Sequence, residues 1–125
     1  MKGADKVFDH GPGRVFVFGS NLLGKHAGGA ARTAREKYGA LDLLGEGFAG
    51  NSYAIPTVGT MWEVLPLGDI KIHVDKFLAF ARSQPELYFF VTRIGCGIAG
   101  YTDEQIAPMF RGAPSNCELP HGWPL

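Results

Sequence analysis

The feature that most constrains the fold is a unit that occurs twice: an apolar run, then a glycine-rich loop, then the start of a helix. The apolar runs are RVFVF (14–18) and the centre of ELYFFVTRI (86–94). Short continuous apolar runs are typical of strands buried on both faces of a parallel sheet. The loops that follow are GSNLLGKHAGG (19–29) and GCGIAG (95–100). Strands that alternate with helices predict an α/β fold.

The segments between these units continue the alternation. AARTAREKYGA (30–40) predicts a helix that stops at Gly39, because glycine favours helix ends. LLGEGFAGN (43–51) predicts a glycine-rich loop, and SYAIPTVG (52–59) predicts a strand that Pro56 ends.

The clearest helix is LGDIKIHVDKFLAFARSQPE (67–86), which Pro85 stops. Its apolar residues fall on one stripe: Ile70, Val74, Phe77, Leu78 and Ala81. After the second glycine loop, Thr102 and Gln105 have the spacing of a capping box, so we expect a helix through Phe110. The remaining tail is rich in proline and predicts irregular structure.

Composition narrows the class of protein. The chain has 125 residues, which predicts one domain over 1–125, and its net charge of zero argues against a broad electrostatic contact with nucleic acid. It has no apolar run long enough for a membrane span, and its first residues, MKGADKVFDHG, lack the apolar core expected of a signal peptide. Its two cysteines form neither a disulfide framework nor a metal cluster, which indicates a cytoplasmic protein with free thiols and no cofactor or metal.

The glycines are unusually frequent, at 18 residues, and many are clustered in the two loops. In open α/β sheets ligands bind beyond the carboxyl ends of the strands, which is where both loops lie. Glycines let backbone N–H groups approach an anion, and a helix N-terminus adds further donors. Two such loops facing one crevice predict a site for two linked phosphates, although glycines also serve simply as tight turns.

The residues Gly95-Cys96-Gly97 suggest a second chemistry. A cysteine at a strand-to-helix turn is similar to a nucleophile elbow, but it needs a histidine base. Only His26, in the first glycine loop, is placed to reach Cys96, since we expect His73 to be exposed on its helix. A cysteine between glycines is more often a small buried side chain, so we favour a loop that holds phosphate over one that attacks a carbonyl.

Three segments together resemble the macrodomain family, whose members bind ADP-ribose. They are VFVFGSNLLGKHAGGAARTA, SYAIPTVG and VTRIGCGIAGYTDEQIAPMF, and the resemblance covers roughly residues 14–111. It is nearest to the branch of the terminal ADP-ribose glycohydrolase, in which RIGCG also occurs. The resemblance implies a mixed, mostly parallel sheet with helices on both faces.

The resemblance also implies a ligand, ADP-ribose or a related nucleotide diphosphate, free or carried on an ADP-ribosylated macromolecule. Asn21 and Tyr101 would contact the distal ribose, and residues 28–31 and 95–101 would surround the diphosphate. The implied ligand-binding residues are Gly19, Ser20, Asn21, His26, Gly28, Gly29, Ala30, Thr57, Gly95, Cys96, Gly97, Ile98, Ala99, Gly100 and Tyr101.

The catalytic residues of the hydrolytic branches have no counterpart here. The nearest branch places a lysine after the middle strand and an aspartate after the second glycine of GCG, where this chain has Val58-Gly59 and Ile98-Ala99. The other branch places an aspartate where Ala30 and Ala31 stand. Asn21 and His26 remain as weak catalytic candidates, so binding without rapid turnover is expected, with hydrolysis as the alternative.

Two further expectations stay open. The acidic residue that reads adenine in the family has Asp9 as its nearest candidate, at a different spacing. The tail HGWPL (121–125) offers an alternative function, a protein-interaction module in which Trp123 is an exposed anchor; the opposing expectation is that Trp123 packs on the core.

Overall fold

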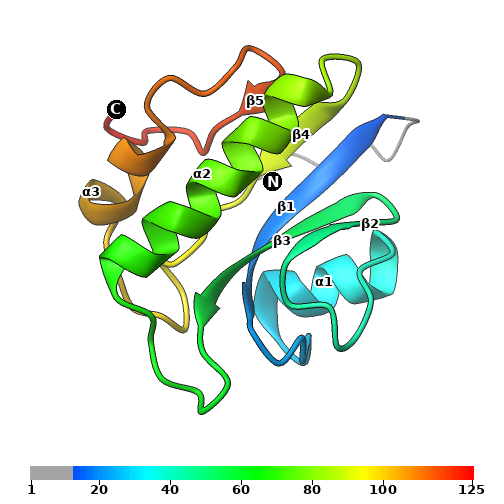
Figure 1. Cartoon of the computed structure of the whole chain (residues 1–125), viewed down its shortest axis with the longest axis vertical. Helices are drawn as coiled ribbons and strands as arrows, with labels where there is room; N and C mark the ends of the chain where they lie inside the picture. Colours follow the sequence, from blue (N-terminus) through cyan, green and yellow to red (C-terminus); the bar gives the residue numbers. More distant parts are fainter. Residues whose placement is uncertain (1–12) are drawn as a thin grey trace.

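Five strands form one mixed sheet in the order β2-β3-β1-β4-β5 in the computed structural model, which describes residues 13–125 (Figure 1). β1 is parallel to β3 and to β4, β4 is parallel to β5, and β2 is antiparallel to β3. The α/β class and the mixed, mostly parallel sheet are therefore confirmed. The strands are β1 (Arg14–Asn21), β2 (Gly47–Ala49), β3 (Ser52–Val58), β4 (Tyr88–Val91) and β5 (Cys117–Glu118).

Helices cover both faces of this sheet. The helices are α1 (Gly29–Lys37), α2 (Leu67–Ser83) and α3 (Asp103–Ile106), and a 3₁₀ turn (Ala107–Phe110) continues α3. Successive side chains of a strand point to opposite faces. Along β1, Val15 and Val17 pack in the larger core with α2, while Phe16 and Phe18 pack in a smaller core with α1. Figure 1 shows α2 lying across its face of the sheet.

The apolar stripe predicted for α2 is confirmed. Its buried residues are Ile70, Val74, Phe77, Leu78 and Ala81. The helix ends at Ser83, before Pro85. The expected exposure of His73 is wrong, because its Nδ1 lies 2.7 Å from Glu46 Oε2 and only 17% of its side chain is exposed.

Strand boundaries differ from the predicted ones where hydrogen bonding to a neighbouring strand sets them. β1 runs past Phe18 to Asn21 because β3 continues to pair with it, with a register shift after Ser20. Pro56 lies inside β3 and does not end it. β2 pairs with Ser52 to Ala54, so the pairing of β2 with β3 does not reach Pro56, which has no N–H to donate.

Two short strands lie in segments predicted to be irregular. β2 lies within the glycine-rich loop of residues 43–51, and β5 lies in the C-terminal tail beside β4. Strands of two or three residues carry too little periodicity to be seen in a sequence.

The C-terminal part packs back onto the sheet. Thr102 and Gln105 form the predicted capping box at the start of α3, although the helix becomes a 3₁₀ turn before Phe110. Trp123 is 8% exposed, and its ring centroid lies 5.1 Å from that of Phe110. The hypothesis of an exposed Trp123 anchor is wrong, because the indole is part of the larger core.

Candidate functional site

A cleft of about 560 Å³ lies at the C-terminal ends of the parallel strands β1, β3 and β4. It lies where ligands bind in open α/β sheets. The predicted site residues that line it are Gly19, Ser20, Asn21, Gly28, Gly29, Ala30, Thr57, Gly95, Cys96, Gly97, Ile98 and Ala99. His26, Gly100 and Tyr101 are not among its lining residues.

The first wall of the cleft is the loop after β1, and Asn21 holds its shape. The Lys25 N–H donates to Asn21 Oδ1 at 2.9 Å, and Asn21 Nδ2 donates to the Lys25 carbonyl at 2.8 Å. The Gly24 N–H closes the turn on the Asn21 carbonyl at 2.9 Å. The amide of Asn21 therefore orders the loop from inside.

Residues 43–45 pack behind this wall. Ser20 Oγ donates to the Gly45 carbonyl, and the Leu43 N–H donates to the Gly24 carbonyl at 2.8 Å. A Cβ on Gly45 would lie 2.4 Å from the Asn21 carbonyl oxygen, so only glycine allows this approach. Residues 43–45 therefore form a support that holds the first wall in place.

His26 belongs to this support and not to the cleft surface. Its side chain is fully buried, with Nε2 3.2 Å from the Leu44 carbonyl and the ring edge-on to Phe18. Nδ1 has no hydrogen-bond partner within residues 13–125. A general base must reach the water that it activates, and the buried imidazole does not border the cleft.

The N-terminus of α1 faces the cleft with free backbone donors. Its N-cap residue is Gly28, which has no side chain to cap the helix, and the first turn contains no acidic residue. The Arg32 N–H is the first to bond back, to the Gly28 carbonyl at 3.1 Å. The N–H groups of Gly29, Ala30 and Ala31 precede it and have no acceptor in the part of the chain that the structure describes.

The second glycine loop presents a similar run of donors. The Cys96 N–H donates to the Arg93 carbonyl at 3.3 Å, and the Gly100 N–H donates to the Gly97 carbonyl at 3.0 Å. Between them, the N–H groups of Gly97, Ile98 and Ala99 have no acceptor among residues 13–125. Successive free N–H groups in a loop form an anion-binding concavity.

The thiol of Cys96 is poorly suited to attack. Burial, a hydrogen bond from Sγ to Asp103 Oδ1 at 3.5 Å, and the negative charge of Asp103 raise its pKa to about 11. Only the thiolate is a nucleophile, and reactive cysteines have a lowered pKa. This environment favours the interpretation in which Cys96 lines a binding loop.

Asp103 ties the second glycine loop to the C-terminal tail. Trp123 Nε1 donates to its Oδ1 and Arg93 Nη1 to its Oδ2, both at 2.8 Å, while Arg93 Nη2 donates to the His121 carbonyl at 2.6 Å. These bonds, chiefly the one from Trp123, lower the pKa of Asp103. The guanidinium of Arg93 borders the cleft but is held by the tail.

The loop after β3 forms the third wall. Trp62 lines the cleft from this loop. Tyr101 Oη donates to the Leu65 carbonyl at 2.7 Å and so connects this loop to the second glycine loop. The structure therefore gives Tyr101 a supporting position beside the cleft.

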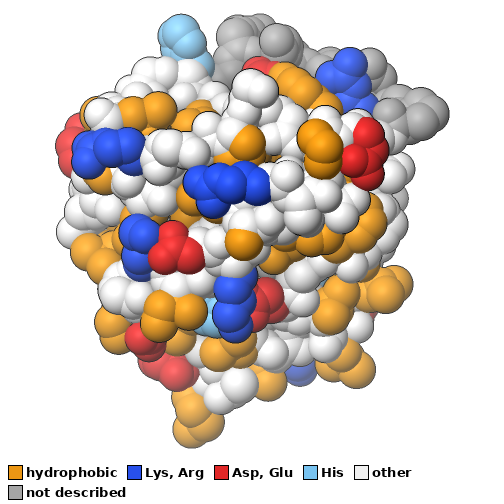
Figure 2. Space-filling model, turned by 45° about the horizontal axis from the view of Figure 1, so that its top comes forward, with side chains coloured by type: hydrophobic (Ala, Val, Ile, Leu, Met, Phe, Trp, Pro, Cys, Tyr) orange, Lys and Arg blue, Asp and Glu red, His pale blue; other side chains and the backbone are white. Residues whose placement is uncertain are grey.

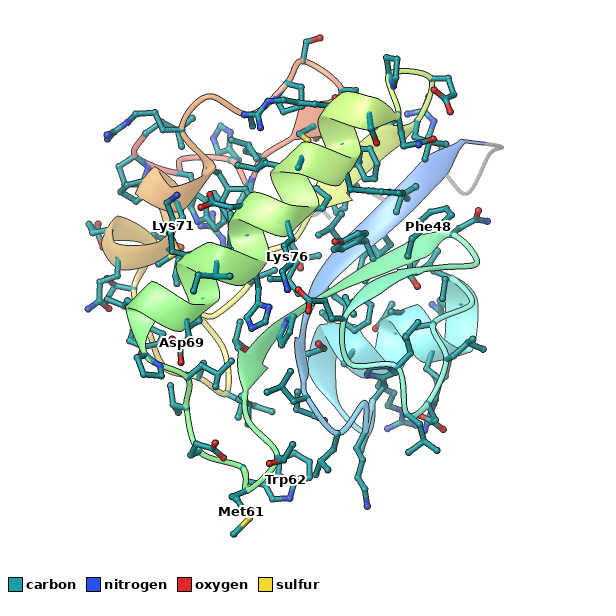
Figure 3. The ribbon with its side chains drawn as sticks, in the orientation of Figure 1. Phe48, Met61, Trp62, Asp69, Lys71 and Lys76 are labelled. Atoms are coloured by element: carbon teal, nitrogen blue, oxygen red, sulfur yellow. The ribbon has the colours of Figure 1, made fainter. Side chains whose placement is uncertain are left out.

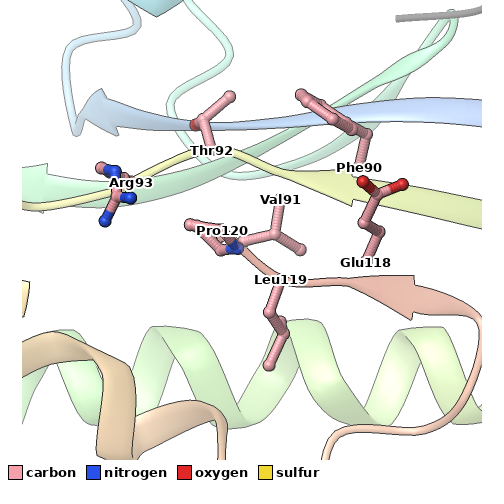
Figure 4. Close-up of a pocket in the computed structure, with 7 residues that line it drawn as sticks. All are labelled: Phe90, Val91, Thr92, Arg93, Glu118, Leu119 and Pro120. Carbon is pink, nitrogen blue, oxygen red and sulfur yellow. The ribbon is translucent and has the colours of Figure 1, made fainter. Parts of the chain in front are cut away.

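A second pocket of about 270 Å³ adjoins the cleft between β4 and β5 (Figure 4). Both spaces are bordered by Thr92 and Arg93. The pocket is otherwise lined by Phe90, Val91, Glu118, Leu119 and Pro120. The Glu118 carboxylate accepts a hydrogen bond from Tyr88 Oη.

The charges of the site are compatible with an anion. The described residues that line the cleft include Lys25 and Arg93 and no aspartate or glutamate. No group of three or more metal-ligating side chains is found within residues 13–125. Elsewhere the charges are mixed: on the face shown in Figure 2, positive and negative side chains are interspersed with hydrophobic ones.

Comparisons with protein-family models, with curated proteins and with solved structures each find no match for this chain. None of the helices in residues 13–125 has the length and apolar character that a membrane crossing requires.

Several lining residues were not predicted from the sequence. They are Lys25, Ala27, Val58, Trp62, Thr92, Arg93 and Ile94. Trp62 had a usable signal, because it follows a buried strand by four residues, and the ends of all parallel strands meet at one edge. Asp9 lies outside the described residues.

Proposed function

We propose that the chain binds a nucleotide diphosphate in the cleft. The observation that carries the proposal is the pair of free donor runs, Gly29–Ala31 and Gly97–Ala99, on facing walls of one cleft. Each run suits one phosphate group, and the helix dipole of α1 adds a favourable field at its end. Neutral glycine and alanine residues let the anion approach both backbones closely.

The resemblance to macrodomains identifies ADP-ribose as the first ligand to test. The chain order of β1, glycine loop and α1, then β3, then β4 and the second glycine loop supports this choice. A base at one end of the diphosphate would fit the adjoining pocket, where Phe90 and Leu119 offer apolar surface.

The decisive variant is Gly97→Val. A Cβ on Gly97 meets no atom within 4 Å and its φ is not left-handed, so the fold accommodates valine. The side chain would, however, occupy the space in which a phosphate meets the loop. We expect ADP-ribose affinity to fall by on the order of tenfold to a hundredfold, because hydrogen bonds to a charged group are lost.

Isothermal titration calorimetry with ADP-ribose measures this effect. Gly68→Val is the matched control, because Gly68 is an exposed glycine of α2 that also has free space around its Cβ and does not line the cleft. Equal affinity in Gly97→Val and Gly68→Val, with both folded by circular dichroism, would show that the loop does not hold the ligand.

A further inference from the structure

Trp62 is an exposed aromatic residue held in an unfavourable backbone conformation at the edge of the cleft. Its side chain is 56% exposed, and its φ of 63° lies in the left-handed region, which is costly for a bulky residue. Figure 3 shows Trp62 and Met61 at the outer end of the loop that follows β3. Such strain often accompanies a functional position.

The loop that carries Trp62 is well fixed. The Gly59 N–H donates to the Glu63 carbonyl at 2.8 Å, and the Met61 N–H donates to Glu63 Oε1 at 2.8 Å. Val58 and Val64 form an isolated β-bridge at its base. The indole is thus presented by an ordered turn and not by a loose segment.

The position of Trp62 relative to the donor runs defines what it can contact. β3 lies on one side of β1 in the sheet, and β4 lies on the other. The adjoining pocket extends the site beyond β4, while Trp62 borders it at the end of β3. A ligand whose diphosphate lies between the two glycine loops would therefore have one end near the pocket and the other near Trp62.

We propose that Trp62 stacks on a ring of the ligand at the β3 end of the cleft. The inference rests on the proposed diphosphate site and names the group beyond it. An indole face stacks on an aromatic base, which typically makes a measurable contribution to binding, and it also packs against the C–H face of a sugar. In both cases the group that stacks on Trp62 is a ring, either the base or a sugar, and it is joined to the diphosphate that the glycine loops would hold.

Tryptophan fluorescence provides a direct test, because the chain contains two tryptophans and Trp123 is buried. We expect ADP-ribose to change the emission of the parent protein. The change should disappear in Trp62→Phe, where only Trp123 remains. ADP gives a change if the base stacks on Trp62, whereas a change with ADP-ribose alone assigns the contact to the distal sugar.

Calorimetry on the same variants separates stacking from folding. Trp62→Ala keeps the left-handed backbone strain but removes the ring, and we expect it to bind ADP-ribose about tenfold more weakly. Trp62→Phe should recover most of the affinity. Met61→Ala is the matched control, since Met61 is 82% exposed in the same turn and does not line the cleft; it should bind as the parent does.

The outcomes distinguish this inference from the proposed function. If the parent binds ADP-ribose but Trp62→Ala binds equally well, or if the emission change persists in Trp62→Phe, the stacking role is wrong and the diphosphate site stands. If the parent binds neither ADP-ribose nor ADP by calorimetry, both proposals are overturned.

Discussion

At the scale of single residues, Cys96 shows how surroundings decide what a side chain can do. It stands between two glycines at the end of a buried strand, which would suit a nucleophile, yet its thiol donates to a carboxylate. Because burial and Asp103 raise its pKa to about 11, very little thiolate is present near neutral pH.

We therefore predict slow alkylation of Cys96 by iodoacetamide at neutral pH, with a rate that keeps rising toward about pH 11. Peptide mass spectrometry resolves Cys96 from Cys117, whose pKa burial also raises to about 11. Asp103→Asn should speed the reaction at Cys96 and leave Cys117 unchanged. A rate that already levels off below about pH 8 would contradict the assigned environment.

Cys96→Ser should bind ADP-ribose as the parent does, because a hydroxyl fits the same place and can also donate to phosphate. A covalent adduct on Cys96 after incubation with ligand, seen in the intact mass, would reverse this interpretation.

At the scale of elements, Asp103 joins the start of α3, the second glycine loop and the C-terminal tail. Its folded pKa is lowered, first by the hydrogen bond from Trp123. A carboxyl with a lowered folded pKa stabilises the fold above its unfolded pKa, and that contribution is lost as the pH falls through the folded value.

We predict that Asp103→Asn lowers the melting temperature near neutral pH and that the difference from the parent shrinks as the pH falls below about 4. Asparagine can still accept the Trp123 hydrogen bond on its amide oxygen, but its NH2 group cannot accept from Arg93. The variant therefore removes the charge together with the Arg93 bond. Asp75→Asn is the control, because the partner of Asp75 within residues 13–125 is the exposed Lys71 of the same helix and surface pairs contribute little. A difference that is constant from about pH 7 to about pH 3 would rule out the ionised Asp103 as its cause.

The elements also show what the sequence could predict. The stripe of α2, the capping box at Thr102 and the strand-to-loop positions of both glycine clusters follow from local patterns, and each is found. β2 and β5 could not be predicted because they depend on a partner strand elsewhere in the chain. Likewise, only the fold reveals that His26 is buried against Leu44, or that the side-chain amide of Asn21 is hydrogen-bonded to the backbone of Lys25.

At the scale of the whole molecule, the loops after β1, β3 and β4 meet at one cleft, and two of its walls present main-chain N–H groups. Its described lining includes no aspartate or glutamate, and the imidazole of His26 lies behind the wall. General acid–base catalysis typically contributes about 10²–10⁴-fold to a rate. The described lining therefore offers no carboxylate that could act as a general base on the proposed ligand.

We therefore predict that the chain releases ADP-ribose from modified protein or nucleic acid hardly faster than the same substrate releases it alone. Quantifying free ADP-ribose over time, with Gly97→Val as the binding-deficient control, measures this. Efficient release that vanishes in Gly97→Val would make the chain an enzyme. Loss of that release in His26→Ala with binding intact would assign the base.

The donor runs of the cleft belong to the main chain, and every amino acid except proline carries the same N–H group. The residues of such a site can therefore be substituted widely without loss of the donors, provided that no new side chain fills the space in which the ligand would lie. Gly28 and Gly97 have no left-handed φ and no atom within 4 Å of a built Cβ, so neither the backbone conformation nor the packing requires glycine there. Substitutions at these positions would leave the fold intact and change only ligand binding in the cleft. An assay that measures folding alone would therefore not detect them.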